Sequence, residues 1–196
     1  MISPRVFALA LLGIATVATT TIIQDPLDTR DETAFADFAR RVQIYAGVHD
    51  AAALTVPRPA VSAAPSEIRR ATEARALVIR SARAGARQGD IFTPRIAAAF
   101  RRAIAAGCQD RYEDLRAAIA EDRECPLPAP AVHARWPIDA ALPTMAPDLL
   151  AALPTLPAGL QYRFLNRDLV LLDIDANLIV DFIPDAIPSG TSASMP

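Results

Sequence analysis

The chain has 196 residues, of which 52% are hydrophobic and 21% charged, and its formal net charge is -2 at neutral pH. This length supports one domain with a sizeable core, and the near-zero charge argues against a nucleic-acid binder. All 20 basic residues are arginine, which the codons of a GC-rich genome explain better than a selected use of arginine for anion recognition.

The first 23 residues have the pattern of a secretory signal. Arg5 precedes an uncharged run over residues 6–23, in which Thr16, Ala18 and Thr20 supply small residues for cleavage after Ala18 or Thr20, as in signal peptides. The alternative is an uncleaved anchor, because the 18 residues of this run approach the ~20 that span a bilayer. We therefore predict an extracytoplasmic protein, periplasmic or secreted. Either residues 1–23 are cleaved off, or residues 6–23 remain and tether the protein to the inner membrane.

Residues 24–187 are predicted to form a single α+β domain that is mostly helical, with about four helices between residues 33 and 123. The first helix is expected from about residue 33 to residue 50, because apolar residues recur there at helical spacing. Its buried face carries Phe35, Phe38, Val42 and Tyr45. His49 follows one turn after Tyr45, which suits a helix end packed beneath the proline-rich segment of residues 125–157.

The second helix is expected from about residue 66 to residue 87, with small and apolar residues on its buried face. These residues are Ile68, Ala71, Ala74, Val78, Ala82 and Gly85. The opposite face carries arginines that form a candidate interaction face, namely Arg69, Arg80, Arg83 and Arg87. Such a face attracts anions, for example membrane phosphates. The alternative is a solvated helix face, partly neutralised by the aspartates of the C-terminal part of the chain.

Two shorter helices follow. Thr93 and Pro94 supply the N-cap and the first residue of the third helix, and a fourth is expected over residues 110–123. Cys108 and Cys125 flank this fourth helix, whose ends lie ~20 Å apart at 1.5 Å per residue. Because bridged Cα atoms lie within ~7 Å, the spacing argues against a disulfide, and unpaired or intermolecular thiols are the alternatives.

Residues 125–157 carry eight prolines, which interrupt regular structure. The segment is nevertheless too apolar for a solvated linker. We therefore expect a proline-rich cover that lies extended over the helices, with one or two helical turns from Pro147 to Leu153.

A two- to three-stranded antiparallel sheet is predicted at the C-terminus, as a meander over residues 160–183. Asn166 and Arg167 form the first turn, and residues 175–177 form the second. The run from Leu169 to Leu172 is apolar throughout, which is typical of a central strand shielded on both faces. Residues 188–196 are expected to be a disordered tail.

No pattern of catalytic residues stands out in the sequence. The chain lacks the G-x-S-x-G, S-x-x-K and H-E-x-x-H motifs, and His49 and His133 have no partner at the spacing of a metal site. Asp173, Asp175 and Asn177 match the first three ligand positions of a calcium loop, but its glycine and glutamate positions hold other residue types. The sequence therefore indicates no catalytic residue, cofactor or metal ligand, and a turn explains the aspartates better.

Three stretches of the chain resemble a group of uncharacterised exported bacterial proteins. They cover residues 81–102, 156–173 and 176–187, and the resemblance implies no activity. The C-terminal hairpin is also similar to the strand–turn–strand ending of the periplasmic nickel/cobalt-homeostasis protein family. That second resemblance is short and implies no ligand for this chain.

We expect a non-catalytic extracytoplasmic module that binds a partner protein or an anionic envelope component. Its candidate contacts are the arginine face and an edge of the small sheet, since an exposed edge accepts a partner strand. The alternatives are a periplasmic metal-linked homeostasis protein and a hydrolase-like enzyme. Nucleic acid is not expected as a partner, and membrane contact is expected only through an uncleaved N-terminal segment.

Overall fold

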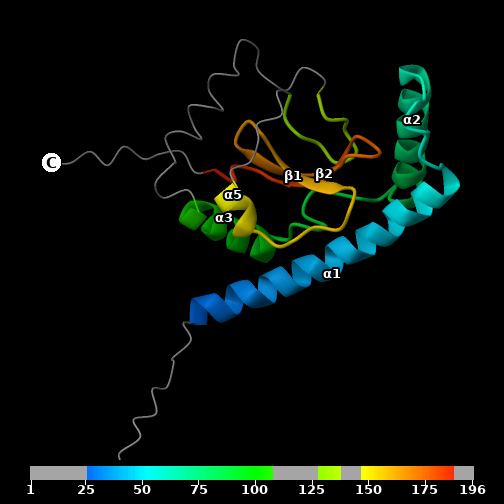
Figure 1. Cartoon of the computed structure of the whole chain (residues 1–196). Helices are drawn as coiled ribbons and strands as arrows, with labels where there is room; N and C mark the ends of the chain where they lie inside the picture. Colours follow the sequence, from blue (N-terminus) through cyan, green and yellow to red (C-terminus); the bar gives the residue numbers. More distant parts are fainter. Residues whose placement is uncertain (1–25, 108–127, 138–146, 188–196) are drawn as a thin grey trace, which may run out of the picture.

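The computed structural model describes residues 26–107, 128–137 and 147–187, in which a group of helices precedes a sheet (Figure 1). The helices are α1 (Pro26–Thr55), α2 (Pro65–Ala82), α3 (Pro94–Gly107) and α5 (Pro147–Ala151). The strands are β1 (Leu160–Leu165), β2 (Asp168–Asp173) and β3 (Leu178–Ile183). This arrangement confirms the predicted α+β fold class.

Several expected features lie outside the described residues. They are the targeting segment, the fourth helix over residues 110–123, both cysteines, and the C-terminal tail. Within the described ranges, no helix combines the length and apolar character that a membrane crossing requires.

The first helix is longer than its apolar pattern predicts. α1 has 30 residues, which corresponds to about 45 Å at the rise of an α-helix, and it extends beyond the expected range at both ends. Pro26 suits the first helical position because that residue needs no N–H donor. The core side of α1 carries residues at helical spacing, namely Ala34, Phe38, Val42, Tyr45, Ala46, His49 and Ala52.

The buried face of α2 differs from the predicted one. Its buried residues are Arg75, Ala76 and Ile79, whereas Ile68 is 46% exposed and a Cβ added at Gly85 would meet no atom within 4 Å. Alanines on every side of this helix give a weak hydrophobic pattern, so packing against α1 decides which face is buried. α2 also ends at Ala82, five residues before the predicted end.

Aromatic side chains from three elements meet in the main core. The Phe38 ring of α1 lies 4.8 Å from Phe100 of α3 and 5.3 Å from Phe92, between ring centroids. The Tyr162 ring of β1 lies 5.8 Å from that of Phe100. Such offset and edge-on pairs add to the hydrophobic stabilisation of a core, and here they fasten the helices to one face of the sheet.

The strands lie where the sequence predicts them. The sheet has the order β1-β2-β3 and both strand pairs are antiparallel. Asn166 and Asn177 adopt positive φ angles of 55° and 48° in the two turns, a conformation that asparagine tolerates better than most residues. β2 is buried on both faces: Leu171 packs toward the helices and Leu172 packs toward Trp136.

The proline-rich segment lies partly on the sheet, and not only over the helices as was predicted. Trp136 is buried on the sheet face that points away from the helices, beside Val170 and Ile179. The preceding residues pair with β3, because His133 donates its N–H to Ile179 O at 2.8 Å and Ile179 donates to Ala134 O at 2.9 Å. Residues 128–137 therefore cover the sheet, whereas α5 lies against α3 and its Leu149 packs in the main core with the helices. α5 supplies the predicted helical turn.

Candidate functional site

One edge of the sheet presents main-chain groups toward a pocket. Two contacts show which residues of β1 form hydrogen bonds with β2. Leu165 pairs with Asp168 across the two-residue turn, and Ile174 N donates to Gly159 O. The N–H and C=O groups of Tyr162 and Phe164 accordingly point away from β2. No described strand pairs with this side of β1.

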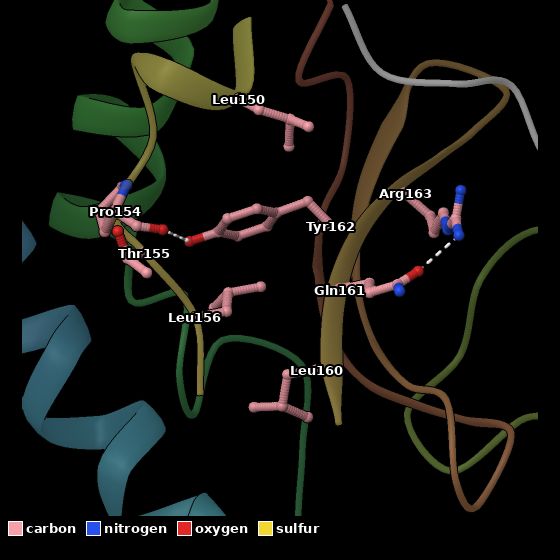
Figure 2. A pocket seen from close by; sticks show the side chains of 8 residues that line it. All are labelled: Leu150, Pro154, Thr155, Leu156, Leu160, Gln161, Tyr162 and Arg163. Carbon is pink, nitrogen blue, oxygen red and sulfur yellow. Dashed lines mark hydrogen bonds between the residues drawn. The ribbon is translucent and has the colours of Figure 1, made fainter. Parts of the chain in front are cut away.

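A pocket of about 450 Å³ runs along this edge. It is lined by Leu150, Pro154, Thr155, Leu156, Leu160, Gln161, Tyr162 and Arg163. Figure 2 shows Leu156 and Tyr162 on one side of the β1 ribbon, and Gln161 and Arg163 on the other. Because successive residues of a strand point to opposite faces, a pocket lined by both sets follows the strand edge itself.

The far wall of the pocket is held in place by Tyr162. Its hydroxyl donates a hydrogen bond of 3.0 Å to the carbonyl oxygen of Pro154 (Figure 2), and burial raises the pKa of this hydroxyl above its ordinary value. The hydroxyl therefore stays protonated and keeps donating. The segment that follows α5 is thus fixed beside β1, and the pocket between them is preformed.

The Arg163 guanidinium on the other side of β1 lacks a charged partner in the described part of the chain. Its Nη2 donates to Gln161 Oε1 (Figure 2), whereas its buried Nε has no hydrogen-bond partner. No described carboxylate lies within ion-pair distance of it. A partly buried cation with an unsatisfied donor favours an incoming carboxylate.

A second cluster joins α1 to the turn between β2 and β3. The Asp173 carboxylate, 0% exposed, accepts a hydrogen bond of 2.8 Å from the Tyr45 hydroxyl. It lies 2.7 Å from His49 Nδ1 and also accepts the N–H of Ala176 at 3.0 Å. The hydrogen bond to Asp173 raises the pKa of His49, against the opposing effect of burial.

The surroundings of His49 leave it little room. Its Nε2 lies 3.5 Å from Asp175, whose carboxylate also pairs with Arg58. A Cβ added at Gly159, which has a φ of 85°, would lie 2.6 Å from His49 Cε1. Only glycine therefore allows the chain before β1 to cross the imidazole ring this closely.

The chemistry of this cluster is that of an anchor. A histidine that serves as a general base holds one ring nitrogen to a carboxylate and points the other at a nucleophile. The second nitrogen of His49 faces Asp175 instead, and its ring is 7% exposed. The buried ion pair thus fastens the C-terminal half of α1 to the sheet.

The four arginines of the predicted interaction face do not form one surface. Arg80 donates two hydrogen bonds to His133 O, at 3.2 and 3.0 Å. Arg83 donates to Val180 O at 3.2 Å and stacks over the Tyr45 ring at 5.0 Å. These two arginines fasten α2 to the sheet and its cover, whereas Arg69 and Arg87 are exposed.

Among the described residues, no group of three or more histidine, cysteine, aspartate or glutamate side chains is arranged to hold a metal ion. Asp173 and Asp175, from the calcium-like stretch, face His49. His133 lies apart at a φ of 67°, and burial lowers its pKa, assisted by Arg83 and Arg80.

The sequence predicted no site residue in the pocket along β1 or in the His49 cluster. Tyr45 and His49 lie 128 and 124 positions before Asp173, so no local spacing reveals their contact with it. The one available signal was the placement of Tyr45 and His49 one turn apart on the buried side of α1. Comparison of the chain with protein-family models, with curated proteins and with solved structures gives no match.

Proposed function

We propose that the protein is a non-catalytic binding module, acting outside the cytoplasm, which captures an extended segment of a partner protein along β1. The observation that carries this proposal is a strand edge with outward main-chain groups beside a preformed apolar pocket. In strand addition, main-chain hydrogen bonds supply affinity and side-chain pockets supply specificity. The location rests on the signal-like pattern of residues 1–23.

The two sides of β1 define the chemistry of the partner segment. Consecutive residues of an added strand point to opposite faces. One residue would place an apolar side chain in the pocket between Leu150, Leu156 and Tyr162. The next would place a carboxylate against Arg163, whose Nε would gain an acceptor. The expected ligand is therefore an extended peptide in which an apolar residue adjoins an aspartate or glutamate.

Selection from a displayed peptide library tests this proposal. Peptides that combine an apolar and an acidic neighbour should be enriched. Two forms of a selected peptide should then be compared, one N-methylated at its odd-numbered residues and the other at its even-numbered residues. One form should lose binding and the other should keep it, because only alternate amides of an added strand donate to β1. Equal binding of both methylated forms would refute strand addition.

Matched substitutions test the location of the site. Arg163→Glu and Leu150→Asp should each weaken binding of a selected peptide by about tenfold or more, since they reverse the charge and fill the apolar pocket with a carboxylate. Arg69→Glu and Leu77→Asp make the same changes on α2, where both side chains are exposed. Equal losses from the α2 variants would show that β1 is not the binding edge.

A further inference from the structure

A second hollow, which shares no residue with the β1 pocket, lies between the loop before α3 and the end of β3. Its volume is about 480 Å³. It is lined by Arg87, Gln88, Gly89, Asp90, Phe92, Pro94, Ala97, Arg101 and Pro184.

The loop that forms this hollow is held rigidly by one carboxylate. Asp181 of β3, 0% exposed, accepts hydrogen bonds from the N–H groups of Gly89, Ile91 and Phe92 at 2.9, 2.8 and 2.8 Å. Gln88 Nε2 donates to Phe182 O at 3.2 Å. A binding site pre-organised in this way loses little conformational entropy when a ligand arrives.

Two arginines from different elements line the hollow without a carboxylate partner in the described ranges. Arg101 of α3 uses its Nη2 to bond Pro184 O at 2.7 Å, which orients the guanidinium. No side-chain hydrogen bond of Arg87 is formed with a described residue. The lining also includes the Asp90 carboxylate, which accepts the N–H of Arg87 at 2.8 Å. Arg41 lies behind the loop and donates to Asp90 O at 2.8 Å.

We infer that this hollow binds a phosphate ester, with Arg87 and Arg101 as the two cationic contacts. Guanidinium groups match the geometry of phosphate oxygens and bind them through charge-assisted hydrogen bonds. Gly89 has a φ of 91° and no side chain, so a ligand can approach the loop backbone closely. The buried Phe92 and Ala97 provide an apolar floor for the group that the phosphate esterifies.

The test uses the protein as recovered from cells, with glycerol phosphate and inorganic phosphate as probes and chloride at equal ionic strength as the reference. Amide resonances of Gly89 and Asp90 should shift saturably with either phosphate compound and not with chloride. Arg87→Gln should weaken this binding about tenfold while leaving thermal unfolding unchanged, because its guanidinium bonds no described residue.

Arg95→Gln is the matched control, because Arg95 is exposed on α3, the helix that carries Arg101, and does not line the hollow. Its binding should equal that of the wild type. Co-sedimentation with phosphatidylglycerol vesicles, compared with phosphatidylcholine alone, separates a lipid headgroup from a soluble ester as the source. The inference is overturned if no saturable shift occurs with either phosphate compound, or if Arg95→Gln weakens binding as much as Arg87→Gln does.

Discussion

The ion pair between His49 and Asp173 makes the stability of the fold depend on pH. A group whose pKa rises on folding stabilises the native state below its unfolded-state pKa, which is about 6.5 for histidine. This stabilisation is lost as the pH rises through the raised pKa of His49. The free energy of unfolding should therefore fall as the pH rises from about 6 through the raised pKa of His49, and it should level off above that pKa.

We expect His49→Gln to cost about 3 kcal/mol of unfolding free energy at about pH 5.5, the usual cost of breaking a buried ion pair. Asp173 would keep Tyr45 and the Ala176 N–H as donors but lose its cationic partner. At about pH 9 the cost should fall to about 1–1.5 kcal/mol, because a neutral imidazole contributes an ordinary hydrogen bond.

The assay is denaturant unfolding at both pH values, followed by the fluorescence of Trp136, the only tryptophan of the chain. Asp175→Asn is the control, because Asp175 lies farther from the imidazole, at 3.5 Å, and its side chain is 16% exposed whereas that of Asp173 is fully buried. It should cost less than about 1 kcal/mol at either pH. If His49→Gln lost the same free energy at both pH values, His49 would not be charged in the native state and the reasoning would be refuted.

Three further substitutions test individual contacts. Gly159→Ala should cost about 3 kcal/mol of unfolding free energy, since its Cβ would lie 2.6 Å from His49. Adding His49→Ala should recover much of that loss in the double variant. If the losses of the two single variants simply added, the clash would be contradicted. Asp181→Asn should cost about 3 kcal/mol of unfolding free energy and speed hydrogen exchange at the backbone N–H groups of Ile91 and Phe92, because the asparagine side chain accepts fewer of their hydrogen bonds than the carboxylate does. Unchanged protection from exchange would contradict this role of Asp181. Trp136→Phe should cost less than about 1.5 kcal/mol in thermal unfolding, because the indole N–H is buried without a partner among the described residues; a larger loss would indicate that the N–H is bonded.

The sheet was the most predictable part of the fold because its signals are local. Asn166 at a two-residue turn and the apolar run of β2 place all three strands within a short stretch of sequence. The α2 face was wrong because alanine occurs on every side of that helix, so Arg75 and Ile79 are buried through contacts that periodicity does not encode. Arg80 and Arg83 were assigned to the outer face for the same reason.

The two surfaces proposed to bind ligands could not be located from the sequence for a further reason. An edge of the small sheet was predicted to accept a partner strand, without a choice of edge, and the pocket at β1 depends on Leu150 and Leu156, whose segment is bonded to β1 through Tyr162 and Pro154. The hollow beside Gly89 similarly depends on Asp181, whose bond partners lie about 90 residues earlier in the chain.

The long separations of these anchors have a consequence for the order of folding. Tyr45 and His49 meet Asp173 across 128 and 124 residues, and Ile91 meets Asp181 across 90. Contacts of such high contact order form slowly, because a large loop must close before they contribute. The attachment of the helices to the sheet through these contacts therefore forms only when the last strand is present. A chain exported as proposed above would form these contacts only after β3 had crossed the membrane.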